Sequence, residues 1–323
     1  MKSWNNRPPE KVLNKSGGLG FLLPKSPLNI MDNILIIDID SRIPNLALKK
    51  VEKYHLDRGD TVTWNMPLMR WEADKIYVSC VFEWNRHKCK EWVGDANIGG
   101  SGWDLYKKLS PEIEAVKPRI NLGFTTRGCI RNCEFCIVPK KEGRIEVVGD
   151  LLDLWDGKSK TIRILDNNIM ALPEHFKMIC QQARDNKIRL DFDGLDARLL
   201  NDDLCNELTT ISHAEYRFAF DKISDRNSVE RAIKLLKAHG IMQSTWYVLV
   251  GFDTTIEEDF ERLNYLRDNG QAAFVQRYNY CKGKEYIQMA RWANQHHIFK
   301  GMTWKQFCNH PENKSKTMAR MVN

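Results

Sequence analysis

The sequence predicts an α/β protein in which an incomplete (β/α)6 barrel follows a smaller parallel α/β layer. Two observations favour this fold class. Short apolar runs alternate with amphipathic helical stretches along most of the 323 residues, and this alternation is typical of parallel sheets. From residue 120 the alternation is regular, with one strand–helix unit in about 25 to 30 residues, a normal size for the motif. A hydrophobic content of 42% allows a sizeable core.

The front region, about residues 31–118, is predicted to be a Rossmann-like layer. Its first strand is a buried run that ends in polar residues, and Gly59-Asp60 ends the helix that follows. In chain order the predicted elements are a strand at 33–39, a helix at about 44–58, strands at 61–64 and 75–81, a glycine-rich loop at 94–102 and a connector ending near Pro118.

The barrel is predicted over about residues 119–282. Its strands are expected at 120–124, 161–165, 188–192, 215–220, 244–250 and 272–277, and its helices at about 148–155, 173–186, 197–210, 225–239 and 255–269. Gly240 and Gly270 stand where glycine caps end helices, and Thr255 with Glu258 can form a capping box. A helical extension is expected over 283–323.

Residues 1–30 are expected to form a disordered basic leader, because they carry five basic residues against Glu10 alone and show no periodicity. Met31 could be the real start, since it stands directly before the first strand. The net charge of +7 is mild, so nucleic acid is a possible partner that the composition does not establish.

The composition also bears on the compartment. No run approaches the roughly 18 apolar residues that a membrane span needs. The cysteine count, nine, is odd, and no secretory segment opens the chain. A reducing cytoplasm is therefore expected.

Three cysteines, Cys129, Cys133 and Cys136, have the spacing C-x3-C-x2-C in a loop after the first barrel strand. Three thiolates can hold three irons of a cubane and leave the fourth iron open, whereas a cluster that only transfers electrons normally takes four protein ligands. The loop lies at the carboxyl ends of the barrel strands, where such barrels place their active sites. A structural zinc site would want a fourth ligand, and none lies nearby in the sequence.

This motif in this context resembles the radical S-adenosylmethionine (SAM) superfamily over about residues 120–280. The resemblance implies a [4Fe–4S] cluster on the three cysteines, with SAM chelated to the open iron. It also implies reductive cleavage of SAM to a 5′-deoxyadenosyl radical that abstracts hydrogen from a substrate that the sequence does not name. A one-electron donor such as flavodoxin or ferredoxin is the implied partner.

The same resemblance implies which residues contact SAM. Asp166, Asn167 and Asn168 match the turn beside the SAM amino group, although a plain Asp/Asn turn explains the same residues. Phe135 matches an aromatic at the adenine end, and Asp221 is the candidate for the ribose. Gly251, Gln276 and Tyr278 match the turns that pack near adenine and form the far wall of the site.

Asp193 is the candidate catalytic residue, because a carboxylate at the end of the third barrel strand faces the barrel mouth. It could bind substrate or assist a proton transfer. Asp196, close by, is about as well explained by capping the next helix.

Two narrower resemblances remain open. Thr126-Arg127-Gly128 before the first cysteine and Val138-Pro139 after the third are similar to methylthiotransferases. That family carries three further cysteines in its front domain, however, where this chain has only Cys80 and Cys89. The front region resembles a degenerate cobalamin-binding domain. The resemblance argues against cobalamin, because the loop after the first strand lacks the histidine of Asp-x-His-x-x-Gly.

The main hypothesis is therefore a radical SAM enzyme, with methylthiolation of RNA or protein as an alternative. A different class remains possible, a non-catalytic iron–sulfur module for redox sensing or binding. A fourth protein ligand, such as Cys281 folded across the mouth, would favour that reading.

Overall fold

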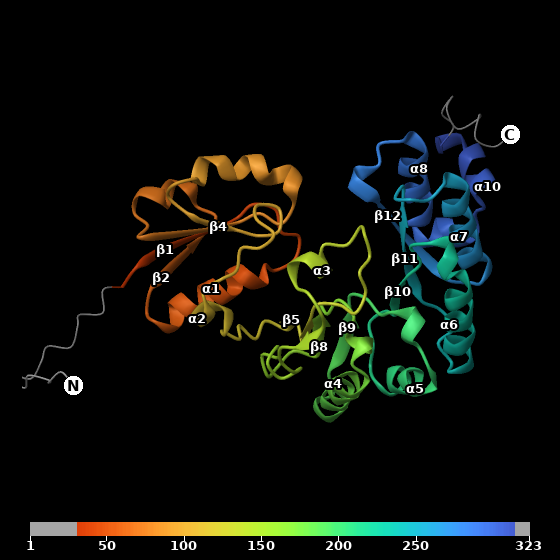
Figure 1. Cartoon of the computed structure of the whole chain (residues 1–323), viewed down its shortest axis with the longest axis horizontal. Coiled ribbons are helices and arrows are strands. Elements are labelled where there is room, and N and C mark those ends of the chain that lie inside the picture. The colour runs from red at the N-terminus through yellow and green to blue at the C-terminus, as the bar shows by residue number, and fades with distance from the viewer. Residues whose placement is uncertain (1–30, 314–323) are drawn as a thin grey trace, which may run out of the picture.

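The computed structural model describes residues 31–313, so the predicted leader and the last ten residues lie outside the described part. Within it, two α/β units follow one another along the chain (Figure 1). The front unit ends near α2 (Pro111–Glu114), and the barrel unit begins at β5 (Leu122–Gly123). The predicted fold class is confirmed.

The front sheet has the parallel order β2-β1-β3-β4. Its strands are β1 (Asn33–Asp38), β2 (Thr61–Trp64), β3 (Lys75–Ser79) and β4 (Asn97–Gly99). Because successive side chains of a strand point to opposite faces, Ile34 and Ile36 pack towards α1 (Leu46–Asp57), whereas Leu35 and Ile37 pack towards η2 (Glu83–Trp92). Neither β4 nor the helix η2 was predicted. The pattern of β4 is weak because it buries a single apolar residue, Ile98.

Six parallel strands form the barrel unit. They are β5, β8 (Thr161–Ile164), β9 (Arg189–Phe192), β10 (Arg217–Ala219), β11 (Thr245–Val250) and β12 (Ala272–Arg277). The two three-stranded sheets β5-β8-β9 and β10-β11-β12 are joined through the bridges Leu190–His213 and Leu195–Phe218. The strands therefore follow one another in chain order, as an incomplete (β/α)6 barrel requires.

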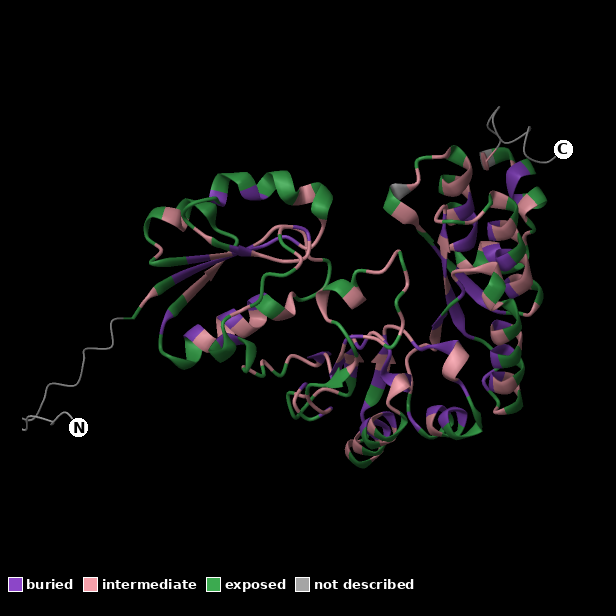
Figure 2. Cartoon of the chain, viewed as in Figure 1, coloured by how far each residue is buried: buried purple, intermediate pink, exposed green. Residues whose placement is uncertain are grey.

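Helices cover the outer face of these strands, and one continuous apolar core lies between the two layers. Figure 2 shows buried residues concentrated in the strands and on the helix faces turned towards them. The helices are α4 (Pro173–Asn186), α5 (Asp202–Thr210), α6 (Arg226–Ala238), α7 (Ile256–Asp268) and α8 (Lys284–Ala293), with α9 (His296–Gly301) and α10 (Trp304–Asn309) after them.

Local capping chemistry follows the prediction. Thr255 and Glu258 form the capping box that opens α7. Gly240 and Gly270 have φ of 82° and 76° just beyond α6 and α7, a left-handed conformation that glycine adopts without strain.

The prediction of a helix at 148–155 is wrong. The chain there forms turns held by Asp150 and Asp153, whose carboxylates accept each other's backbone N–H groups. The helix predicted at 197–210 is split, because Asn201 caps a new start at α5.

No helix of residues 31–313 is long and apolar enough to cross a membrane.

Candidate functional site

The cysteine loop is closed at its neck by a two-stranded antiparallel ribbon. β6 (Thr126–Arg127) pairs with β7 (Glu146–Val147), so the chain leaves the barrel and returns beside itself. Gly128 sits at this neck with φ of 83°. A Cβ atom there would lie 2.3 Å from the carbonyl oxygen of Arg144, so only glycine allows the two chain segments to come this close.

The three cysteines of the loop are half-buried and unpaired. Cys129 Sγ accepts the backbone N–H of Arg131 at 3.3 Å. Burial raises the pKa of Cys136, and the backbone N–H of Val138 only partly opposes this. Burial also raises the pKa of Cys133, while the charge of Arg198 opposes this.

The donor set suits a cluster better than a single ion. No group of three His, Cys, Asp or Glu side chains within residues 31–313 gathers closely enough to hold one metal ion. A cubane does not need such convergence, because each of its irons takes its own thiolate. The three thiols on one short loop therefore fit the predicted [4Fe–4S] cluster.

A buried charge network lies against Cys129. Asp196 receives Nε of Arg131 at 3.0 Å and Nε of Arg198 at 2.7 Å. Burial opposes ionisation of Asp196, but these two guanidinium groups outweigh it and hold the pKa of the carboxyl below its usual range. The sequence suggested for Asp196 a capping role, and it does accept the N–H of Arg198; its link to the cysteine loop through Arg131 was not predicted.

Asn168 joins this network to the cysteines. Its Nδ2 donates to Asp196 Oδ2 at 3.0 Å and lies 3.7 Å from Sγ of Cys129. Its Oδ1 is buried and has no hydrogen-bond partner among the described residues. An orphaned buried acceptor is costly, so this oxygen marks a place where a donor of a ligand can bind.

Asp166 is bonded to the chain segment just before the cysteine loop. The side chain is buried, and its two oxygens accept the N–H and hydroxyl groups of both Thr125 and Thr126 at 2.6–2.9 Å. Burial raises the pKa of Asp166, and these four bonds work against that effect. The carboxylate thus pins the chain just before the cysteine loop.

Asn167 points to a third partner. Its Nδ2 donates to Oε2 of Glu142 at 2.8 Å, and the same oxygen accepts the N–H of Gly128 at 3.0 Å. Glu142 also pairs with Arg127 at 2.8 Å. The predicted trio 166–168 is therefore brought to the cysteine loop, and among its buried side-chain atoms only Oδ1 of Asn168 lacks a partner.

Asp221 stands two residues after β10. Its Oδ1 accepts the N–H of Leu249 at 3.1 Å. Burial raises its pKa, and its charge acts on both Cys133 and Cys136. Asp221 is thus near Cys133 and Cys136, and its contact with ribose stays a prediction.

An aromatic chain connects the cysteine loop with the ends of β11 and β12. The ring of Phe135 meets Phe252 edge to face at 5.6 Å, and Phe252 meets Tyr278 at 4.6 Å. The close neighbour of Gly251 is Cys281, because a Cβ at Gly251 would lie 2.8 Å from Cys281 Sγ. Gln276 is exposed.

Asp193, the candidate catalytic residue, is paired with Arg163 at 2.7 Å, and both side chains are about one-third exposed. Arg217 pairs in the same way with Asp191 and Glu215. The charges of Arg163, Asp193 and Arg217 act on the Tyr247 phenol, whose pKa burial raises. Asp193 therefore belongs to a paired polar surface.

Arg198, whose charge acts on Cys133, was not predicted from the sequence. The available sign was its place in the segment that follows β9.

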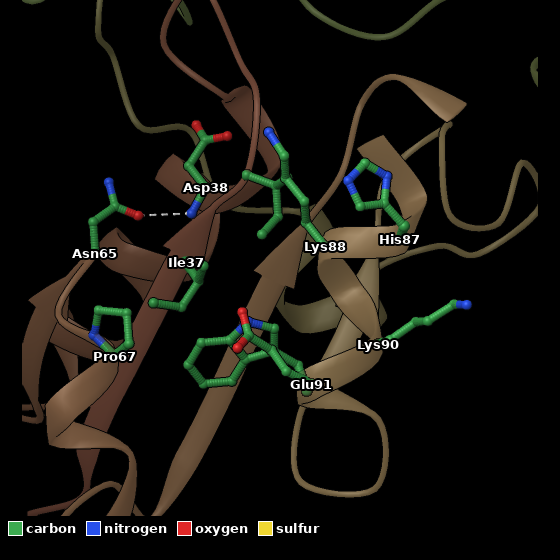
Figure 3. A pocket seen from close by; sticks show the side chains of 10 residues that line it. Ile37, Asp38, Asn65, Pro67, His87, Lys88, Lys90 and Glu91 are labelled. Carbon is green, nitrogen blue, oxygen red and sulfur yellow. Dashed lines mark hydrogen bonds between the residues drawn. The ribbon is translucent and has the colours of Figure 1, made fainter. Parts of the chain in front are cut away.

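The front sheet carries an open hollow of about 590 Å³ beyond the carboxyl ends of β1 and β2. Figure 3 shows Asp38, whose N–H donates to Asn65, beside His87 and Lys88 from η2. Nδ1 of His87 lies 3.0 Å from the carbonyl of Trp84. Parallel sheets bind ligands at such edges. The loop after β1 has no histidine, as the sequence indicated, but η2 brings one to the same hollow.

The two units meet beside the cysteine loop. Lys141 in α3 (Val138–Lys141) donates from Nζ to the Ser101 hydroxyl of the front unit at 2.7 Å. Burial lowers the pKa of this lysine, and the nearby charge of Arg127 adds to the effect.

Comparison with known proteins supports the superfamily. The chain is 28% identical over 214 residues to the tRNA-2-methylthio-N(6)-dimethylallyladenosine synthase of Aquifex aeolicus, which covers 55% of this chain. The chain spans about half of that relative, 48% of its length. No protein-family model matches the chain.

The radical S-adenosylmethionine methyltransferase TsrM from Kitasatospora setae, solved with cobalamin and a [4Fe–4S] cluster, has a similar fold. The TM-score is 0.58 with 11% sequence identity, over 77% of this chain and 75% of TsrM. The cysteine loop at the strand ends, the relative in sequence and the shared fold together support the resemblance to the radical SAM superfamily.

Proposed function

We propose that the chain is a radical SAM enzyme whose cluster is held by Cys129, Cys133 and Cys136. When bound, the cluster and SAM supply the one-electron cleavage that makes a 5′-deoxyadenosyl radical. The protein contributes orientation and exclusion of water. The observation that carries this proposal is the buried, unpartnered Oδ1 of Asn168 next to Cys129.

The proposed roles follow from the contacts around the loop. Asn168 Oδ1 accepts a hydrogen bond from the ammonium group of SAM, since a charged donor suits a buried acceptor without a partner. The N–H of Leu249 occupies Oδ1 of Asp221, and the other carboxylate oxygen accepts a hydrogen bond from a ribose hydroxyl. Phe135 and Phe252 supply apolar surface for adenine.

The substrate binds at the strand ends beside the cysteine loop in this proposal. Asp193 and Arg163 offer both signs of charge there, which suits a substrate with polar or ionised groups. The front unit acts as a lid or docking surface, which the contact between Lys141 and Ser101 supports. A flavodoxin- or ferredoxin-type protein supplies the electron.

Methyl transfer with cobalamin is a second candidate, favoured by one specific observation. The hollow at β1 and β2 contains His87, with Nδ1 next to a carbonyl and Nε2 on the other side of the ring. A metal-binding histidine commonly has this arrangement. We keep cobalamin as the less favoured cofactor, because the side chain of His87 is exposed and comes from η2 rather than from the β1 loop. Methylthiolation is disfavoured because Cys80 and Cys89 are buried in the core of the front unit.

The test is anaerobic reconstitution of the full chain with iron and sulfide, followed by incubation with SAM and dithionite. Formation of 5′-deoxyadenosine supports the proposal. A bound cluster without SAM cleavage, and with no change of its EPR spectrum on adding SAM, would favour the non-catalytic module. Cobalamin that copurifies with the chain, or binds to it at one equivalent, would favour the second candidate, and a His87→Ala variant would show whether η2 takes part.

A further inference from the structure

A histidine outside the site described above is linked to the cysteine loop by a continuous chain of hydrogen bonds. His175 lies in the first turn of α4, and its Nε2 is 3.0 Å from the hydroxyl of Thr125. The Thr125 hydroxyl donates to Asp166 Oδ2 at 2.6 Å. Because the hydroxyl donates its one hydrogen to Asp166, it can only accept a hydrogen bond from the imidazole. Nε2 of His175 therefore carries a hydrogen.

This series of hydrogen bonds ends at the backbone that leads into the cysteines. Asp166 holds the N–H groups of Thr125 and Thr126 at 2.7 and 2.9 Å, and Cys129 follows three residues later. Thr125, Thr126 and Asp166 are buried, so water does not readily replace any of these bonds. A change at His175 is therefore transmitted to the start of the loop.

We infer that His175 is a positioning residue for the cysteine loop: its Nε2–H orients the Thr125 hydroxyl, which keeps Asp166 bonded to the chain before Cys129. The inference rests on the proposed cluster, since it concerns how well the loop holds iron. It concerns a residue that touches neither cysteine nor SAM.

The surroundings of His175 keep the imidazole neutral near pH 7. Burial lowers its pKa, while Asp166 and Asp150 oppose this by favouring the charged form. The positive end of the helix, where His175 lies, also disfavours a cation. Acidification that protonates His175 adds a positive charge beside Asp166, and this charge should raise the midpoint potential of a cluster on the loop.

The experiment compares full-length wild type with His175→Gln and His175→Leu after anaerobic reconstitution. Glutamine can place an amide donor near the position of Nε2, whereas leucine cannot. His239→Leu is the matched control, because it removes a surface contact with Asp202, 2.9 Å long, at the end of α6. The readouts are the rate of iron release to a chelator, the midpoint potential between pH 5 and 8, and the thermal unfolding midpoint.

We expect His175→Leu to lose iron about tenfold faster, the scale of one lost hydrogen bond, and His175→Gln and His239→Leu to resemble wild type. The rise of the potential at low pH should vanish in both His175 variants. Equal iron release from wild type and His175→Leu, or iron loss in His175→Gln as fast as in His175→Leu, would overturn the inference. A wild-type chain that takes up no iron would contradict the proposed function itself.

Discussion

The side chain of Asn168 lies against Cys129 with its amide nitrogen 3.7 Å from Sγ, and this nitrogen also donates to Asp196 at 3.0 Å. The orientation leaves Oδ1 buried without a partner. The amide is therefore held by one end, and its free acceptor is next to the proposed cluster ligand. This relationship is the most specific link between the fold and the proposed chemistry.

Asn168→Ala should weaken SAM binding and keep the cluster. If the amide oxygen accepts the SAM ammonium, its loss should cost about 1.5–3 kcal/mol, the range for a hydrogen bond to a charged group. Equilibrium binding of SAM to the reconstituted protein measures this, with iron content as the control. An unchanged dissociation constant would remove Asn168 from the SAM site.

Asp166→Ala should act on the loop rather than on SAM directly. Four buried donors of Thr125 and Thr126 would lose their acceptor. At about 1–3 kcal/mol for each buried group left unsatisfied, partly relieved by water, the unfolding free energy should fall by at least about 2 kcal/mol. The unfolding free energy, measured by urea titration, and the iron content should fall together. A variant with full stability and iron but weaker SAM binding would restore the direct role.

Each of Cys129→Ala, Cys133→Ala and Cys136→Ala should abolish the visible absorbance of the cluster and all SAM cleavage, because three thiolates hold three irons. Cys205→Ala is the matched control, since Cys205 is buried in the apolar core of the barrel unit. It should keep iron and activity. Full iron and turnover in any of the three loop variants would refute the ligand set.

His213 should make the protein less stable as the pH falls below about 6.5. The ring is stacked between Phe192 and Tyr216, and neither ring nitrogen has a partner among the described residues. Burial lowers its pKa to about 4. A histidine with a lowered folded-state pKa binds its proton more tightly when unfolded, so stability is present above the unfolded value and is lost as the pH falls towards 4.

The loss should be at most about 3–4 kcal/mol, because each pKa unit between the unfolded and the folded value corresponds to about 1.4 kcal/mol. Urea unfolding of wild type and His213→Phe between pH 7 and 4 measures it. The variant should show a flatter profile, because phenylalanine can keep the stack without titrating. Parallel profiles would show that other groups cause the pH dependence.

The sequence predicted the architecture because strand and helix periods, caps and the cysteine spacing are local features. Thr255, Gly240 and Gly270 all cap as expected. The turns at 148–155 were mistaken for a helix because Asp150 and Asp153 bond to the backbone instead. The strand β4 was missed because its pairing with β3 is a tertiary contact.

The site was predicted less fully for the same reason. The trio 166–168 lies beside the cysteine loop, but which atom is free depends on partners far away in sequence. Thr125 and Thr126 donate to Asp166, and Nδ2 of Asn167 donates to Glu142. Among the buried side-chain atoms of the trio, only Oδ1 of Asn168 has no partner. Spacing in one segment contains no information about these long-range partners.

The most direct test of the central claim is the metal content and SAM chemistry of the anaerobically reconstituted full chain. We expect about four irons and four sulfides per chain, as a cubane requires. We also expect an EPR signal of the reduced cluster that changes when SAM is added, and 5′-deoxyadenosine after reduction. Zinc in place of iron, or a four-iron cluster whose signal is indifferent to SAM and that yields no 5′-deoxyadenosine, would contradict it.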